Sequence, residues 1–232
     1  MMTENVLVVA AHPDDEALGC GGTMLRHAAQ GADVSVLFLT DGVTSREQSG
    51  QAEVEARRAA MARALKILGV KQHCCLSFPD NAVDSVPVLD VVRAVERCVA
   101  EWGAPDVVYT HCPMDLNVDH GVAHRAVMTC FRPQPASRPA PRSVLTFEVL
   151  SSTGWYGSTS PVAFVPNYFV DISSTLQRKL EALQAYAEEL RPWPHARSPE
   201  AVEHLARHRG SMVGLAAAEA FMVERMIVQE FP

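Results

Sequence analysis

The sequence predicts a Rossmann-like, three-layer α/β/α fold with a mostly parallel sheet in a single domain. Short apolar runs of strand length alternate with amphipathic segments of helix length, which favours right-handed crossovers between parallel strands. The 232 residues suffice for one sizeable core and are too few to hold two full-sized enzyme domains comfortably. In a sheet of this kind, ligands bind at the carboxyl ends of the strands.

The first half of the chain supplies this alternation. Its apolar runs are typical of buried parallel strands and cover residues 5–11, 33–40 and 104–110. The helical patterns between them cover residues 16–30, 47–68 and 86–101. Alternate burial of Cys74 and Cys75 fits a further short strand.

The pattern changes after residue 131. Residues 131–142 are rich in proline and predict an internal loop. Further strands are expected at residues 143–149 and 167–172. The polar, glycine-containing segment between these strands has the composition of a surface loop that could border a site.

Two helical patterns finish the chain, at residues 174–190 and 199–229. The second contains Gly210, where a break is conceivable. We therefore expect one domain over residues 1–232, with a loop-rich region at 131–172 and C-terminal helices at 174–232.

The composition is that of an ordinary soluble globular protein, with 48% hydrophobic and 20% charged residues. The net charge of −7 offers no general attraction to nucleic acid or anionic lipid, so neither is an expected partner. The N-terminus has no basic region before an apolar core, and no apolar stretch approaches roughly eighteen residues. These features indicate a cytoplasmic protein with a small-molecule partner, and they leave a homo-oligomer open.

A candidate metal-ligand pattern follows the first predicted strand. His12, Asp14 and Asp15 stand where that strand ends, at the edge of the sheet where ligands bind. An imidazole and a carboxylate three residues later can reach one divalent ion across a tight turn. The alternative is that Pro13 starts a helix whose N-terminal dipole the acidic residues favour, but this leaves His12 unexplained.

The glycines that follow, in GCGG at residues 19–22, do not form the G-x-G-x-x-G pattern of a dinucleotide loop. The acidic turn before them would repel a pyrophosphate. We expect these glycines to let a helix pack closely on the sheet, and a nicotinamide-dependent enzyme is disfavoured.

A second cluster follows the strand expected at residues 104–110. If Asp119 opens a helix, His120 and His124 share one helical face. Gly121 stands where the H-E-x-x-H motif requires glutamate, so this is a different arrangement. His120 would face the same crevice as the first cluster, whereas His124, one turn deeper, fits a structural role.

These residues resemble the PIG-L/LmbE-like family of zinc-dependent N-deacetylases, which act on N-acetylglucosamine-type substrates. The resemblance is carried by AHPDDEALGCGGT at residues 11–23 and DLNVDHGVAH at residues 115–124, with weaker similarity over most of the chain. It implies hydrolysis of the C–N amide bond in a small N-acetylated molecule, either a sugar or a sugar-nucleotide.

By motif position, the resemblance implies that His12, Asp15 and His120 ligate zinc, and ferrous iron suits the same ligands. Three protein ligands leave one position for water, whose pKa zinc can lower to about 7. Asp14 would then act as the general base and later protonate the departing amine.

One position departs from the family pattern. Asn117 stands where many members have a histidine that stabilises the tetrahedral intermediate. Asn117 could act as a neutral donor, His111 could take the role, or the metal could carry more of it. By analogy Asp119 would orient a neighbouring group, although a helix cap is an equally good interpretation.

Candidate substrate contacts are less specific. Arg57 matches a family position that resembles a substrate contact, but it also fits an exposed charge on an amphipathic helix. Asp80 and His111 are further candidates, although the sequence around Asp80 also fits a plain turn. Trp193 could stack on a sugar ring while His195 or Arg197 meets a polar group, with loop packing as the alternative.

The sequence therefore predicts a metal-dependent N-deacetylase. A non-catalytic sugar or nucleotide-sugar binding protein is one rival, and it requires no function for Asp14. A metal-dependent esterase or phosphohydrolase is the other, and the product released from a small substrate panel distinguishes it.

Overall fold

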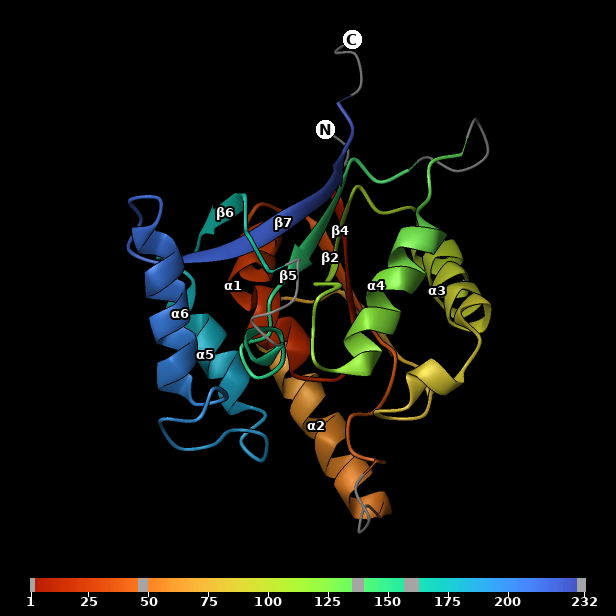
Figure 1. The fold of residues 1–232 in the computed structure, drawn as a ribbon, viewed down its shortest axis with the longest axis horizontal. Helices are drawn as coiled ribbons and strands as arrows, with labels where there is room; N and C mark the ends of the chain where they lie inside the picture. Colours follow the sequence, from red (N-terminus) through yellow and green to blue (C-terminus); the bar gives the residue numbers. More distant parts are fainter. Residues whose placement is uncertain (1–2, 46–49, 135–139, 157–162, 229–232) are drawn as a thin grey trace.

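The structure is a computed structural model that describes residues 3–45, 50–134, 140–156 and 163–228. It contains a seven-stranded sheet in the order β3-β2-β1-β4-β5-β7-β6 (Figure 1). The first five strands run parallel, and β7 lies antiparallel between β5 and β6. The strands are β1 Asn5–Ala10, β2 Asp33–Phe38, β3 Gln72–Cys75, β4 Val107–His111, β5 Ser143–Phe147, β6 Tyr168–Asp171 and β7 Ala218–Met226.

Helices cover both faces of the sheet, as predicted. Helices α3 and α4 lie on one face, whereas α1, α2, α5 and α6 lie on the other (Figure 1). No helix in the described ranges has both the length and the apolar character needed to cross a bilayer. The helices are α1 Asp15–Ala29, α2 Gln51–Leu68, α3 Val88–Trp102, α4 Val118–Cys130, α5 Leu176–Gln184 and α6 Pro199–Ser211, with short 3-10 turns η1 Val83–Ser85 and η2 Thr153–Trp155.

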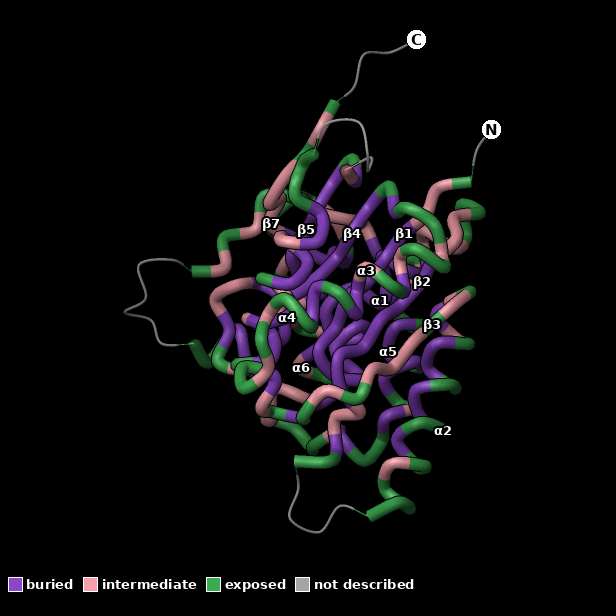
Figure 2. Tube along the Cα trace, turned by 90° about the vertical axis from the view of Figure 1, so that its right-hand side faces the viewer, coloured by how far each residue is buried: buried purple, intermediate pink, exposed green. Residues whose placement is uncertain are grey.

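Both faces of the sheet are buried, which explains the continuous apolar run of the first strand. Val6, Val8 and Ala10 of β1 pack toward α1, α2, α5 and α6, and Leu7 and Val9 pack toward α3 and α4. The strands accordingly form the buried centre of the molecule (Figure 2). Alternating burial in two cores is what a parallel sheet between two helical layers requires.

The prediction of a helix over residues 199–229 is wrong beyond Ser211. Helix α6 ends there, and the chain returns as strand β7. The backbone of Leu215 and Ala217 lies 2.6 and 2.9 Å from where a Cβ of Gly210 would be, so the chain folds back tightly at this glycine. Pairing with β5 and β6 decides the strand, because its sequence AEAFMVERM has no strong preference of its own.

Helix α1 is broken at Cys20, whose φ of −143° is not helical. A buried ion pair from the C-terminal half satisfies the broken ends. Glu219 of β7 accepts hydrogen bonds from the backbone N–H groups of Gly22 (2.8 Å) and Thr23 (2.7 Å), and Lys179 donates to the Leu18 carbonyl (2.8 Å) and to Glu219 (2.6 Å). The residues that precede and begin α1 are thereby fixed against the rest of the fold.

The glycines of this segment let α1 approach the sheet closely, as predicted. A Cβ on Gly19 would lie 2.2 Å from the Phe147 ring, and one on Gly22 would lie 2.8 Å from Ile172. Neither separation is possible between real side chains, so α1 could not keep its position if these residues had a Cβ.

We predict that Gly19→Ala destabilises the protein by about 2 kcal/mol, because the new methyl group must displace the Phe147 ring. The matched control is Gly121→Ala in α4, where a Cβ meets nothing within 4 Å. That control should be neutral or stabilising by up to about 1 kcal/mol, because alanine is the better helix former. Urea unfolding monitored by circular dichroism measures both, and equal stability of the two variants would contradict the prediction.

Candidate active site

The candidate site begins in the turn that joins β1 to α1. Asp14 lies there with a φ of 123°, a left-handed value that is strained for a residue other than glycine. Asp14 occupies the N-cap position of α1, but its side chain makes no capping hydrogen bond. The Asp14 carboxylate is therefore available for contacts other than a helix-capping hydrogen bond.

Three predicted ligand residues converge beside this turn. His12 Nδ1 lies 3.2 Å from Asp15 Oδ2, and His120 Nε2 lies 3.3 Å from the same oxygen. One ligand atom from each residue lies within 4.8 Å of the others, and all three side chains are buried. One cation could therefore contact two imidazole nitrogens and a carboxylate at the carboxyl ends of β1 and β4.

A second carboxylate fixes each imidazole from behind. Asp119 Oδ2 lies 3.0 Å from His12 Nε2, and Asp115 Oδ1 lies 3.0 Å from His120 Nδ1. The remaining nitrogen of each ring faces Asp15. Histidine ligands of metals are usually oriented in this way, through a carboxylate on the other ring nitrogen.

Both outer carboxylates are themselves held in place. Asp119 accepts hydrogen bonds from the backbone N–H groups of Asn81 (2.8 Å) and Val83 (2.9 Å). Asp115 accepts from the hydroxyls of Ser152 (3.0 Å) and Thr153 (2.6 Å). Loops at the ends of β3 and β5 thereby position the two imidazoles.

The site has unsatisfied buried atoms that fit a cation. Neither Asp15 Oδ1 nor His120 Nε2 has a hydrogen-bond partner in the described part of the chain. Burial alone would lower the pKa of His12 and His120, yet the adjacent carboxylates raise these pKa values to about 10 and about 9. The cluster therefore attracts positive charge, whether as protons or as a metal ion.

Asp14 lies outside this cluster and contacts arginine side chains. Arg197 Nη1 is 3.3 Å from Asp14 Oδ2, and Arg57 Nη1 is 4.0 Å from it. Glu189 bridges the two arginines, at 3.0 Å from Arg57 and 3.4 Å from Arg197. Burial raises the pKa of Asp14 to about 6, and the two guanidinium groups limit this rise. Arg57 is only 6% exposed, so its interpretation as a solvated helix charge is wrong.

The remaining predicted residues have defined positions. Asn117 caps α4, where its side-chain oxygen accepts from the Asp119 N–H at 2.9 Å and its amide donates to Asn81 at 3.0 Å. The helix cap is thus Asn117 and not Asp119. Asp80 is buried 3.4 Å from His12 Nε2 and accepts hydrogen bonds from Thr40 and Ser45.

His111 lies beneath the site. Its fully buried ring stacks on that of His120 at 3.8 Å, and its Nε2 accepts a hydrogen bond from the Ala11 N–H at 2.9 Å. Burial and the neighbouring His120 lower the pKa of His111 well below its usual value, so this imidazole is neutral. His124 lies 3.6 Å from Glu224, away from the cluster.

A cavity of about 300 Å³ opens onto His120. Sequence reasoning did not identify Trp155, which lines this cavity, although its segment was expected to border a site. Trp193, which was considered for sugar stacking, packs against His204 at 5.2 Å and does not line the cavity. The described residues that line it are Asn81, Leu116, Asn117, Val118, His120, Ser151, Ser152, Trp155 and Arg197.

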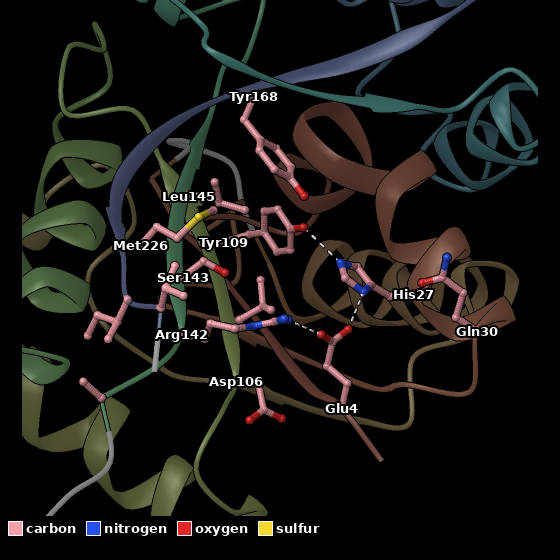
Figure 3. A pocket seen from close by; sticks show the side chains of 14 residues that line it. Glu4, His27, Gln30, Asp106, Tyr109, Arg142, Ser143, Leu145, Tyr168 and Met226 are labelled. Atoms are coloured by element: carbon pink, nitrogen blue, oxygen red, sulfur yellow. Dashed lines mark hydrogen bonds and ion pairs between the residues drawn. The ribbon is translucent and has the colours of Figure 1, made fainter. Parts of the chain in front are cut away.

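A larger cavity of about 720 Å³ lies at the opposite end of the sheet, near the first residues of β4 and β5 (Figure 3). Its ionisable groups pair with one another: His27 lies 3.0 Å from Glu4 and 3.0 Å from the Tyr109 hydroxyl, and Arg142 contacts Glu4. No group of potential metal ligands from the described residues lines it. Although this cavity is larger, the smaller cavity is the better candidate for an active site, because it opens onto His120 and the group of potential metal ligands.

Comparison with known proteins identifies the family of this chain. The family model PIG-L: GlcNAc-PI de-N-acetylase matches residues 7–131, which include His12, Asp15 and His120. The chain belongs to the PIG-L family. Its match spans β1 to α4, and Arg197 and Trp155 lie outside it.

Two relatives of this PIG-L chain are named as deacetylases. It is 31% identical to an uncharacterized deacetylase, YaiS, of Escherichia coli over 150 residues, which cover 62% of this chain and 78% of that protein. It is 32% identical to the diacetylchitobiose deacetylase of Thermococcus kodakarensis over 193 residues, covering 79% of this chain and 69% of that protein.

Solved structures share the whole fold. The conserved protein TT1542 of Thermus thermophilus has a TM-score of 0.73 and 27% identity, over 99% of this chain and 98% of that one. GalB of Pseudomonas putida, a 4-carboxy-2-hydroxymuconate hydratase, has a TM-score of 0.72 and 22% identity, over 99% of this chain and 100% of that one. Because a hydratase shares the fold, the reaction of this PIG-L chain must be argued from its site.

We predict that Arg57→Met destabilises the protein by about 3 kcal/mol, because it leaves the buried carboxylates of Glu189 and Asp14 with one cation fewer. Arg58→Met, one residue along α2 and exposed, is the matched control and should change stability by less than about 0.5 kcal/mol. Thermal and urea unfolding measure both variants. A loss of the same size in the two would show that the ion pairs of Arg57 contribute nothing.

Proposed function

We propose that the protein is a metal-dependent N-deacetylase that hydrolyses the acetamide of a small sugar-type substrate. The observation that carries the proposal is the convergence of His12, Asp15 and His120, with each imidazole fixed by a second carboxylate. Membership of the PIG-L family supports the proposal, as does the similarity to proteins of Escherichia coli and Thermococcus kodakarensis that are named as deacetylases.

We propose these three residues as the metal ligands. Two nitrogens and one carboxylate suit zinc, and ferrous iron suits the same donors. A divalent ion held there would lower the pKa of a water molecule toward neutrality and polarise the acetamide carbonyl. The unsatisfied Asp15 Oδ1 and His120 Nε2 support such an ion.

Asp14 is the proposed general base. Asp14 lies two residues after His12 in the same turn and is not one of the three converging ligands. Its Oδ1 has no hydrogen-bond partner among the described residues. It would take the proton of the attacking water and return it to the departing amine. The left-handed backbone at Asp14 fits a functional position that tolerates strain.

The cavity beside His120 is the proposed substrate site. Trp155 lines this cavity and is 54% exposed, and its ring is nearly perpendicular to that of His195, with 5.8 Å between the ring centroids. Amides and hydroxyls from Asn81, Ser151 and Ser152 line the remaining wall. An aromatic platform with uncharged polar groups is suited to a sugar ring and its hydroxyls.

We predict that the purified protein binds about one divalent ion per chain and that Asp119→Asn weakens its affinity roughly 10- to 100-fold. The amide of asparagine would donate to His12 Nε2 and leave the proton on Nδ1, the nitrogen that faces Asp15. Asp84→Asn, in the exposed part of η1, is the matched control. Zinc titration by calorimetry measures both, and equal affinity in the two variants would contradict the role of Asp119.

We predict acetate release from N-acetylglucosamine or N,N′-diacetylchitobiose, with kcat lowered roughly a hundredfold or more in Asp14→Asn. This variant should retain its metal, because Asp14 is not a proposed ligand. Asp90→Asn, exposed on α3, is the control and should retain full kcat. Phosphate release from phosphate esters without acetate release would favour a phosphohydrolase. Ligand binding without turnover, unaltered in Asp14→Asn, would favour a binding protein.

A further inference from the structure

Arg197 is the one charged group of the cavity wall that the proposed chemistry leaves without a role. It lies between α5 and α6, far in sequence from the turn that holds Asp14. Its backbone N–H donates to His195 Nδ1 at 3.0 Å, and its Nε donates to Ser151 Oγ at 2.9 Å. Its Nη1 lies 3.3 Å from Asp14 Oδ2. Nη1 also lies 3.4 Å from Glu189 Oε2, so Ser151, Asp14 and Glu189 together hold the guanidinium through Nε and Nη1.

The second terminal nitrogen of this guanidinium is available. Arg197 Nη2 has no acceptor among the described residues, and the side chain is 28% exposed where it lines the cavity. Among the described residues of the cavity wall, Arg197 is the only arginine or lysine. Among the described residues of this wall, a substrate in the cavity would therefore meet one permanent cation, that of Arg197.

The other candidates for stabilising negative charge are committed elsewhere. Asn117 carries no charge, and its amide donates to Asn81 at 3.0 Å. His111 is fully buried against the His120 ring, its Nε2 accepts a hydrogen bond from the Ala11 N–H, and it is not among the described residues that line the cavity. Of the donors weighed from the sequence, neither presents a cation to the cavity.

We propose that Arg197 is a catalytic residue, which donates a hydrogen bond from Nη2 to the acetamide oxygen as that oxygen becomes negatively charged. This inference rests on the proposed function. In many family members a histidine at the position of Asn117 stabilises the tetrahedral intermediate. We assign this stabilisation of negative charge to the guanidinium of Arg197, which lies in the connection between α5 and α6.

The charges of the network make this contact stronger in the transition state than in the bound substrate. Before reaction, Arg57 and Arg197 face the carboxylates of Asp14 and Glu189, so the four formal charges cancel. When Asp14 takes the proton of water, its negative charge disappears and the positive charge of Arg197 loses part of its compensation. Only interactions that strengthen in the transition state raise kcat.

The step balances in atoms and charge. The water oxygen bonds to the acetamide carbon, the carbonyl π electrons move onto its oxygen, and the water proton moves to Asp14. The C–N bond then breaks, and the proton on Asp14 passes to the nitrogen to give acetic acid and the free amine. Arg197 keeps its own protons throughout, because a guanidinium does not deprotonate near neutrality.

Steady-state kinetics on the zinc-loaded full chain test the proposal. We expect Arg197→Met to lower kcat roughly a hundredfold, as the loss of an oxyanion donor typically does, while KM stays within about threefold. Arg197→Lys should recover part of kcat, because it restores the charge without the fork. Arg191→Met is the matched control, since Arg191 is exposed in the same segment and, among the described residues, its side chain donates to the backbone carbonyls of Glu188 and Leu190.

A binding measurement separates contact with the oxygen from an effect through Asp14. Calorimetry on the Asp14→Asn protein would compare the affinities of two ligands. One is N-acetylglucosamine, and the other is its analogue in which a methylphosphonamidate, a tetrahedral anion, replaces the acetamide. Adding Arg197→Met should weaken the phosphonamidate roughly tenfold or more and the acetamide by less than about threefold. Metal content and melting temperature of each variant verify that the site and fold are intact.

The possible failures are distinguishable. If wild-type protein releases no acetate from the substrate panel, the proposed function fails. Two results with an active wild-type protein would overturn the catalytic role of Arg197. One is that Arg197→Met has the kcat of the wild type, whether or not its KM rises. The other is that adding Arg197→Met to Asp14→Asn leaves the affinity for the phosphonamidate unchanged.

Discussion

The organisation of the site depends on one buried carboxylate, Asp15, held between two imidazoles. Each imidazole is fixed by a second carboxylate, so a dense negative charge lies where little water can screen it. Such a cluster is tolerable only with compensating positive charge, from protons or from a metal ion. Two features hold these side chains in position. The ion pair of Lys179 and Glu219 fixes α1 at its break, and the backbone of η1 donates to Asp119.

The C-terminal half completes a site that the N-terminal half begins. The family match ends at residue 131, yet Glu219 and Lys179 hold α1, and Arg197 and Glu189 flank Asp14. Trp155 likewise comes from beyond the matched segment. The proposed metal ligands therefore lie in the part shared with the family model, whereas four of the nine described residues of the cavity wall come from later segments, which can vary between relatives without altering the ligands.

The sheet topology explains how these distant segments meet. The parallel strands β1 and β4 bring two ligand-bearing turns to adjacent positions at one edge of the sheet. The antiparallel strand β7 then returns along β5 and brings Glu219 against the break in α1. A fold of the same shape in a hydratase shows that this architecture provides a place for chemistry without deciding which reaction occurs there.

The sequence by itself determined the alternating strands and helices of the first half and the two clusters that converge, because strand ends in a parallel sheet share one edge. It did not determine β7, whose strand form depends on pairing with β5 and β6, nor the burial of Arg57 by Glu189. The positions of Trp155 and Arg197 were also decided only by tertiary structure. Local pattern fixes periodicity, whereas contacts between segments that are distant in the sequence depend on how the whole chain packs.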